Sequence, residues 1–321
     1  SDSFLRKRGR LSVSLYPPPK DIVTEVWSKI PKKFHKENVR TPWIAANKFG
    51  MEPHSFLEGP SFDRNGNLYV VDIPFGRIFR ISPDKEWTLV TEYDGEPNGL
   101  KIHKDGRIFI ADYKRGILQV DADTGTVTPY CERWRVESFK GVNDLVFDAS
   151  GNVYFTDQGL TGMHDPTGRV FRLSADGERL DCLVDTVPSP NGLVPNLTED
   201  IIYLAVTRAN QVWRVPLLDD GGTAKVGVFL HLSGGGGGPD GMALDEEGGL
   251  LVSHAGNGCV WHFDAMGEPK HRIRSCTGLV TTNLAFGGPD NKSLFITESH
   301  SGAILKADLP VAGKTMFSHL N

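Results

Sequence analysis

The sequence predicts a single all-β domain, a six-bladed β-propeller with four antiparallel strands in each blade. Three observations lead to this fold class. A short strand motif occurs six times along the 321 residues, a second strand follows each copy after a turn, and glycine (36) and proline (20) are as frequent as many tight turns require. Helical patterns do not alternate with the strands, so a βα barrel of similar length does not fit.

The first strand of each repeat is rich in β-branched and aromatic residues, as in Gly66-Asn-Leu-Tyr-Val-Val-Asp72. Its copies are separated by 40, 45, 49, 48 and 44 residues and start at Gly66, Gly106, Gly151, Asp200, Gly248 and Lys292. The second strands alternate apolar with polar residues and start at Arg77, Gly116, Arg169, Gln211, Cys259 and Ala303. A third apolar stretch, such as residues 87–93, completes several repeats. Repeats of about 40–50 residues with this content are typical of propeller blades.

The repeats run from about residue 56 to residue 310, so we expect one propeller domain over residues 21–321. To close the ring, the two ends of the chain must share a blade. Residues 23–28, residues 314–318, or both, can supply the missing outer strand. Residues 1–20 are expected to be a flexible tail, because the basic residues near its start are followed by no apolar stretch of a signal peptide.

Composition excludes several classes of partner. Acidic and basic residues are interspersed and the net charge is −5, so no nucleic-acid surface is expected. No apolar run is long enough to cross a membrane, and no membrane partner is predicted. The four cysteines are far apart and form no Cys-x-x-Cys pair, which favours reduced thiols and a cytoplasmic protein. The sequence leaves the oligomeric state open.

One position of the innermost strand carries only Glu, Asn or Asp in all six repeats. These six positions, called the ring residues below, are Glu58, Asn98, Asn143, Asn191, Asp240 and Asn283. Because innermost strands line the central channel, the six side chains should point at the axis at one height. Two buried carboxylates among amides need a cation, and all-oxygen ligands suit Ca²⁺ first, with Mg²⁺, Mn²⁺ or Zn²⁺ as alternatives. The competing interpretation, that these are turn residues, does not account for Glu58.

A second acidic column lies about 14 residues after the ring residues. Its members are Asp72, Asp112, Asp157, His254 and Glu298. We interpret the carboxylates as caps of the hairpin turns, and we keep His254 and the nearby His300 as candidates for substrate contact. The third repeat has an extended hairpin, residues 158–168, in which Met163 and His164 are candidates to contact a ligand.

At these residues the sequence resembles the regucalcin/gluconolactonase family, the senescence-marker-protein-like metal-dependent lactonases. The shared motifs are Phe56-Leu-Glu-Gly-Pro60, Val142-Asn-Asp144, Pro190-Asn-Gly-Leu193, Pro239-Asp-Gly-Met242 and Thr282-Asn-Leu-Ala-Phe-Gly-Gly288. The resemblance covers about residues 56–310 and implies a six-bladed propeller. It implies metal ligands at Glu58, Asn191 and Asp240, a further ligand or substrate contact at Asn143, and a general base at Asp240. One departure is Gly141, where some members have an Arg that binds substrate hydroxyls; Lys140 is adjacent.

We therefore expect a metal-dependent hydrolase that opens a sugar lactone or related cyclic ester to a hydroxy acid. The cation polarises the carbonyl, and water activated with the help of Asp240 attacks it, so Asp240 and Glu58 are the expected catalytic residues. Hydrogen bonds to the substrate or to water are expected from Asn98, Asn143 and Asn283, and a proton from His254, His300 or water. Two alternatives stay open: a metal-dependent isomerase, dehydratase or cyclase of a small metabolite, and a non-catalytic calcium-binding propeller.

Overall fold

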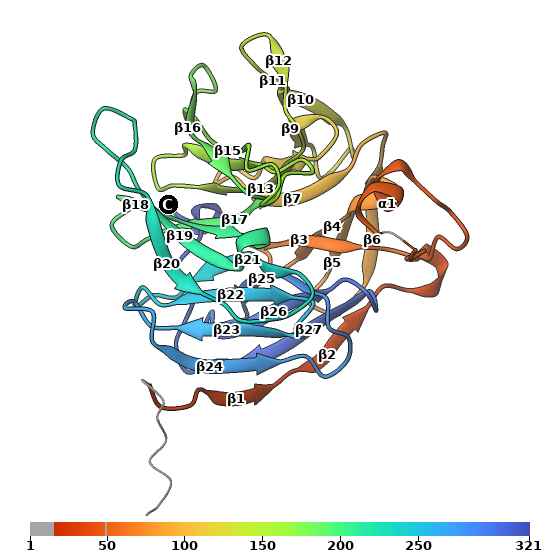
Figure 1. Cartoon of the computed structure of the whole chain (residues 1–321). Helices are drawn as coiled ribbons and strands as arrows, with labels where there is room; N and C mark the ends of the chain where they lie inside the picture. The colour runs from red at the N-terminus through yellow and green to blue at the C-terminus, as the bar shows by residue number, and fades with distance from the viewer. Residues whose placement is uncertain (1–15, 49) are drawn as a thin grey trace, which may run out of the picture.

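Six small antiparallel sheets surround a central axis, so the predicted six-bladed propeller is confirmed (Figure 1). The computed structural model describes residues 16–48 and 50–321. Each innermost strand contacts the innermost strand of the next blade, and β25 of the last blade contacts β3 of the first, which closes the ring. Positive φ at turn glycines such as Gly66 and Gly106 (φ 79° and 92°) allows the tight return from first to second strand.

Each blade consists of four strands, numbered here from the axis outward. Blade 1 contains β3 (Leu57–Phe62), β4 (Leu68–Asp72), β5 (Arg77–Ile81) and β6 (Trp87–Glu92), and blade 2 contains β7 (Pro97–Ile102), β8 (Ile108–Asp112), β9 (Gly116–Val120) and β10 (Val127–Cys131). Blade 3 contains β13 (Val142–Phe147), β14 (Val153–Asp157), β15 (Gly168–Leu173) and β16 (Leu180–Val187), and blade 4 contains β17 (Pro190–Pro195), β18 (Ile201–Val206), β19 (Gln211–Pro216) and β20 (Gly227–His231). Blade 5 contains β21 (Gly238–Leu244), β22 (Leu250–Ala255), β23 (Cys259–Phe263) and β24 (Pro269–Arg274), and blade 6 contains β25 (Thr281–Gly287), β26 (Ser293–Glu298) and β27 (Ala303–Asp308).

The N-terminal segment completes the last two blades. β2 (Glu25–Lys29) pairs antiparallel with β27 and is the fourth strand of blade 6, whereas residues 314–318 form no strand. β1 (Lys20–Val23) pairs parallel with β24 and gives blade 5 a fifth strand. Figure 1 shows both strands in red along the outer edge of the blue strands. Most of the predicted tail, residues 1–15, lies outside the described residues, and its last residue, Lys20, begins β1.

Apolar side chains fill the space between adjacent blades, and hydroxyl groups join the blades near the axis. Leu100, Phe155, Leu204 and similar residues from the strands are fully buried. The Thr156 hydroxyl of blade 3 donates to the Asn191 carbonyl of blade 4 at 2.8 Å. In the same way Thr207 donates to Pro239 O at 2.7 Å and Ser299 to Leu57 O at 2.6 Å, so the chain's last blade is tied to its first. The acceptors of these bonds are ring residues or their neighbours.

Two insertions lie outside the blade pattern. The segment between β2 and β3 contains α1 (Pro42–Asn47), which begins with Pro42 after the N-cap Thr41, whose hydroxyl accepts from Ile44 N. Trp43 from α1 packs against Phe56, just before β3, with ring centroids 5.2 Å apart. The short strands β11 (Arg133–Trp134) and β12 (Glu137–Ser138) form a hairpin between blades 2 and 3.

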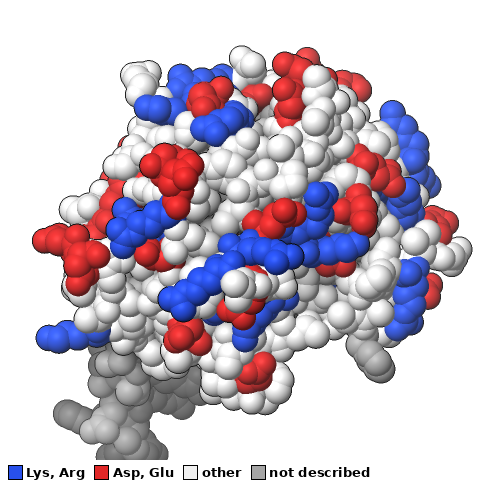
Figure 2. Space-filling model, turned by 90° about the horizontal axis from the view of Figure 1, so that it is seen from above, with Lys and Arg blue, Asp and Glu red and all other residues white. Residues whose placement is uncertain are grey.

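Charged groups of both signs cover the surface. Figure 2 shows Lys and Arg intermingled with Asp and Glu on the face that is uppermost in Figure 1. The four cysteines are free. No helix within the described part of the chain is long and apolar enough to cross a bilayer.

Candidate functional site at the channel mouth

The six ring residues all lie at the beginning of the innermost strands, at one end of the channel. Five of them are buried, with at most 6% of their surface exposed, and Asp240 is partly exposed. In every blade the register between first and second strand is interrupted at or beside the ring residue, for example between Glu58 and Ser61 and between Pro239 and Met242. Such bulges redirect side chains, so the ring residues owe their orientation to a repeated local irregularity.

Glycine follows the ring residue in four of the six blades because the innermost strands approach one another closely there. A Cβ on Gly192 would lie 2.3 Å from Asp240 O, and a Cβ on Gly99 would lie 2.9 Å from Asn143 O. Blade 3 differs, since Asp144 stands where these blades have glycine. Its buried carboxylate accepts from Leu145 N at 2.8 Å and from Asn283 Nδ2 at 3.3 Å, so it adds a third acidic group to the ring.

The carboxylates of the second acidic column hold the entry to the ring strands. Asp112 and Glu298 also cap their hairpin turns as predicted, whereas Asp72 makes no hydrogen bond to the described residues of its turn. Asp72 accepts from Phe56 N at 2.7 Å, and Asp157 accepts from Gly141 N at 2.8 Å. Each of these backbone donors stands two residues before a ring residue. Asp112 and Glu298 act similarly in blades 2 and 6. These four carboxylates are buried. Asp72 also pairs with Arg77, and Asp157 also pairs with Arg169.

The three ring carboxylates resist ionisation in the absence of a cation. Burial, the charge of Asp240 and that of Asp144 raise the pKa of Glu58 well above its ordinary value. Burial also raises the pKa of Asp144. Burial and Asp144 raise the pKa of Asp240 to about 8, although Lys48, Arg208 and a hydrogen bond from Asn191 oppose the shift. Like charges collected in a low-dielectric site produce this behaviour, and a divalent cation removes it.

Two of the ring amides, Asn143 and Asn191, keep a side-chain oxygen available for another ligand. Asn191 Oδ1 is buried and has no hydrogen-bond partner among the described residues. Asn143 donates its Nδ2 to Gln158 Oε1 at 2.7 Å, which leaves its Oδ1 free to face another group. Asn283 Nδ2 donates to Glu58 Oε2 at 2.8 Å. Carboxylate and amide oxygens, one of them unpaired, are the donor set that hard divalent cations take, so these residues fit such an ion.

The expected ligand set contains few ionisable groups. Across residues 16–48 and 50–321, no group of three or more His, Cys, Asp or Glu side chains has the arrangement of a metal site. The expected ligands Glu58, Asn191, Asp240 and Asn143 are half amide, so their arrangement is of a different kind. Asn98 lies at the corresponding position of β7 and is buried.

The three histidine candidates lie in different environments. His254 is fully buried, its Nδ1 accepts from Trp261 Nε1 at 3.1 Å, and its Nε2 lies 3.1 Å from Gly234 O. Nε2 therefore contacts the glycine run before β21 and Nδ1 is engaged by Trp261, so both ring nitrogens of His254 are used within the protein. His300 is exposed in the turn after β26, and His164 is exposed in the extended hairpin of blade 3.

Two cations near the ring were not predicted from the sequence. Lys48, directly after α1, and Arg208, in the 3₁₀ helix Thr207–Ala209, both act electrostatically on Asp240. Burial lowers the pKa of Lys48, while Asp240 and Glu58 oppose the shift. Asp144 has a sequence signal, an acid in place of the ring glycine. Arg208 lies in the hairpin between the second and third strands of its blade, and Lys48 precedes the repeats, so neither stands out in the sequence.

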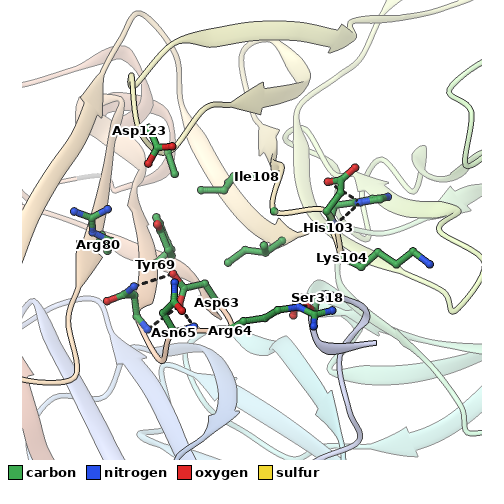
Figure 3. Close-up of a pocket in the computed structure, with 15 residues that line it drawn as sticks. Asp63, Arg64, Asn65, Tyr69, Arg80, His103, Lys104, Ile108, Asp123 and Ser318 are labelled. Atoms are coloured by element: carbon green, nitrogen blue, oxygen red, sulfur yellow. Dashed lines mark hydrogen bonds and ion pairs between the residues drawn. The ribbon is translucent and has the colours of Figure 1, made fainter. Parts of the chain in front are cut away.

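A separate pocket of about 410 Å³ lies at the opposite face of the disc, between the turns of blades 1 and 2 (Figure 3). Its polar groups satisfy one another. Asp63 accepts from Asn65 N and Asn67 N, both at 2.9 Å, and Arg64 Nε donates to Ser318 O at 2.9 Å. Since β3 runs from the ring to this face, the pocket is separated from the ring by the length of the strand.

Comparison with known sequences identifies relatives over most of the chain. A family model described as the SMP-30/Gluconolactonase/LRE-like region matches residues 56–300, which include every ring residue. The lactonase drp35 of Staphylococcus saprophyticus is 32% identical over 268 residues, which are 77% of this chain and 78% of that protein. The lactonase drp35 of Staphylococcus aureus (strain MRSA252) is 30% identical over 242 residues, 72% of each chain.

Solved structures share the fold at lower identity. A calcium-binding protein, regucalcin, from Agrobacterium tumefaciens has a TM-score of 0.74 and 21% identity, covering 93% of this chain and 98% of that one. A gluconolactonase from Xanthomonas campestris has a TM-score of 0.71 and 21% identity, covering 93% and 99%. The segment with α1 and Lys48 precedes the residues that the family model matches.

Proposed function

This chain belongs to the SMP-30/gluconolactonase/LRE-like family, and from this premise we propose that it is a lactonase that depends on one divalent cation, Ca²⁺ in the first place, held by the ring. The observation that carries the proposal is the meeting of Glu58, Asp144 and Asp240 with the unpaired Asn191 Oδ1. Buried acids with raised pKa values beside an unsatisfied oxygen favour a cation-binding, catalytic site over a structural one.

Glu58, Asn191, Asp240 and Asn143 would hold the cation. When bound, it would polarise the ester carbonyl of a lactone and stabilise the negative charge that develops on the oxygen. Asn283 orients Glu58, the Asn191 amide orients Asp240, and Gln158 orients Asn143. These hydrogen bonds fix the ring before substrate arrives, which is the preorganisation that catalysis needs.

Asp240 is the proposed general base, because it is the ring carboxylate that is partly exposed. In its ionised form it accepts a proton from water as the water oxygen bonds to the carbonyl carbon. The bond from that carbon to the ester oxygen of the cyclic lactone then breaks. The departing oxygen takes a proton from water or from one of the exposed histidines, His300 or His164. The product is the open-chain hydroxy acid, and Asn98 is proposed to contact the substrate hydroxyls. The amide of Asn283, the other candidate, is engaged by Glu58, Asp144 and Leu284 N.

The test is a panel of sugar and non-sugar lactones, assayed with the full chain after chelation and after addition of Ca²⁺, Mg²⁺, Mn²⁺ or Zn²⁺. We expect turnover only with a cation, and a loss of about 10²–10³-fold in kcat/KM for Glu58→Gln and Asp240→Asn. Asp123→Asn, an exposed Asp at the opposite face, is the matched control.

Full activity and full metal affinity in both ring variants would overturn the proposal. Metal binding without turnover of any lactone would instead favour a calcium-binding propeller or an enzyme of another class.

A further inference from the structure

Two cations from separate parts of the chain lie beside segments that carry ring carboxylates, Lys48 against Phe56 before Glu58 and Arg208 next to Thr207, which is bonded to Pro239 before Asp240. Lys48 acts electrostatically on both Asp240 and Glu58, and Arg208 acts on Asp240 and on Lys48. Lys48 precedes blade 1 and Arg208 belongs to blade 4, so the two reach the ring from different sides. Such an arrangement around a channel mouth offers two points of attachment to one ligand.

Lys48 is held in this position by packing. Its backbone N–H donates to Ile44 O, which fixes it at the end of α1. Its ammonium lies 4.2 Å from the centroid of the Phe56 ring and 5.7 Å from that of Trp43. Because Phe56 stands two residues before Glu58, these cation–π contacts keep the ammonium beside the ring.

Arg208 is held by the strand that carries Asp240. The neighbouring Thr207 donates its hydroxyl to Pro239 O at 2.7 Å, and a Cβ on Gly238 would lie 2.1 Å from Thr207 O. On its other side Arg208 borders the extended hairpin of blade 3, since a Cβ on Gly162 would lie 3.7 Å from Arg208 Cγ and 3.2 Å from His164 Nδ1. Arg208 itself is exposed to solvent at the mouth.

Among the residues that the structure describes, no ion pair or hydrogen bond engages the side chain of Lys48 or Arg208. Three carboxylates of the ring region face three cations, the third being Lys101, which acts on Asp144. A divalent cation at the ring therefore leaves two formal positive charges in excess, and a neutral substrate would not balance them.

Lys140, the residue beside the family position that carries an Arg in some members, does not supply this charge. Its ammonium donates to Thr167 Oγ1 at 2.7 Å, in the extended hairpin. The adjacent Gly141 packs against Tyr113, and a Cβ on Gly141 would lie 2.7 Å from Cζ of the Tyr113 side chain. The positive charge at this mouth therefore comes from Lys48 and Arg208.

We propose that the substrate is a lactone that carries a carboxylate or a phosphate in addition to its cyclic ester, and that Lys48 and Arg208 bind this anionic group. The inference rests on the lactonase function proposed above. The planar guanidinium of Arg208 suits two oxygens of either group, and Lys48 adds a second charge from the opposite side.

The experiment compares lactones that differ in one charge. The γ-lactone of glucaric acid is paired with that of gluconic acid, and the phosphorylated δ-gluconolactone is paired with its unphosphorylated form. We expect the wild-type protein to prefer one anionic member by about tenfold or more in kcat/KM, mainly through KM, and this preference to decline with added salt. The two pairs distinguish a carboxylate from a phosphate.

Two variants, Lys48→Met and Arg208→Met, should lose the preference, so that the ratio of kcat/KM for the charged to the neutral member of each pair falls toward one. Lys48→Arg should retain part of it, and Lys104→Met, at the opposite face, should change nothing. A second readout is calorimetric binding of the open-chain acids glucarate and phosphogluconate, with calcium and with chelator. We expect each Met variant to weaken this binding by about tenfold.

Equal kcat/KM for charged and neutral lactones, or a preference that both Met variants retain, would overturn the inference while the lactonase function stands. If no lactone is turned over, the lactonase function fails, and the binding of the two open-chain acids still decides whether the anion site exists.

Discussion

Asp240 is the residue whose raised pKa bears on both of its proposed roles, in metal binding and in catalysis. Its pKa of about 8, and the raised pKa values of Glu58 and Asp144, mean that the metal-free protein carries protons in the ring that the unfolded chain releases near pH 4. Between these pH values the folded state binds more protons than the unfolded state, so the free energy of unfolding falls as the pH rises. The ring is thus a source of instability that a cation can relieve.

A first prediction concerns thermal unfolding with calcium or with chelator at about pH 5.5 and about pH 8. Calcium should raise Tm by about 5 °C more at the higher pH than at the lower pH. At about pH 5.5 the cation must displace protons from the ring carboxylates, whereas at about pH 8 more of these protons are already lost. Differential scanning calorimetry measures it. In Asp240→Asn the difference between the two pH values should shrink. An equal calcium effect at both would show that the ring carboxylates do not bind the ion.

Among single residues, the six ring residues could be predicted from the sequence, because aligning the repeats shows one position that is always Glu, Asn or Asp. The sequence did not give Asp144 a role, since that carboxylate occupies a position where most blades have glycine. Lys48 could not be found, because it precedes the repeats and has no counterpart in the other blades. Arg208 occupies the hairpin position that Lys114 occupies in blade 2, so the sequence alone does not distinguish it. Their meeting with Asp240 is a property of the folded chain alone.

Among the elements, the innermost strands carry the strictest packing requirement. Replacing Gly192 by Ala would force a Cβ to within 2.3 Å of Asp240 O and 2.8 Å of Gly241 Cα, both in backbone that cannot move independently. We expect Gly192→Ala to lower the free energy of unfolding by about 1–3 kcal/mol and to weaken calcium binding. Gly227→Ala, with nothing within 4 Å of the new Cβ, is the matched control and should change neither. Urea unfolding and calorimetric titration measure the two quantities, and wild-type values for Gly192→Ala would contradict the prediction.

The buried carboxylates of the second acidic column should contribute more to stability than exposed carboxylates do. Asp157 is fully buried and accepts from Gly141 N and from Arg169, so Asp157→Ala should cost about 3–5 kcal/mol by leaving both donors unsatisfied. Arg169 also pairs with Glu137, but its Nε and Nη2 lose their acceptor in Asp157→Ala, so adding Arg169→Met should recover part of this loss. Asp181→Ala, in an exposed pair with Arg179, should cost less than about 1 kcal/mol. If Asp157→Ala matched the exposed variant in chemical denaturation, the buried pair would have no structural role.

The blades could be predicted from the strand pattern, but the bulges at the ring residues could not. Alternation and β-branched residues identify a strand and its length, but the register shift beside each ring residue depends on the neighbouring blade. The glycines after Glu58, Asn98, Asn191 and Asp240 were the trace of that contact in the sequence. They could equally belong to ordinary turns until the adjacent strands were seen to approach them.

For the whole molecule, closure depends on the N-terminal strands. Removing residues 1–24 deletes β1, and removing residues 1–29 also deletes β2, the outer strand of blade 6. We expect the shorter deletion to lower Tm but keep one cooperative transition, because every blade retains four strands. The longer deletion exposes the edge of β27 and should abolish the cooperative transition in near-ultraviolet circular dichroism. A cooperative transition in the longer deletion would mean that three strands suffice in the last blade.

The hydrogen bond from Asn283 to Glu58 joins residues 225 positions apart in the chain. It has a consequence for the order in which the protein acquires its properties during synthesis. A nascent chain that has released five blades already carries Glu58, Asn191 and Asp240, but the amide that orients Glu58 has not yet emerged. The first acid of the site is therefore set in place by the last blade to be made. Activity is expected to appear only on completion of the polypeptide, which spares the cell from partly built and active enzyme.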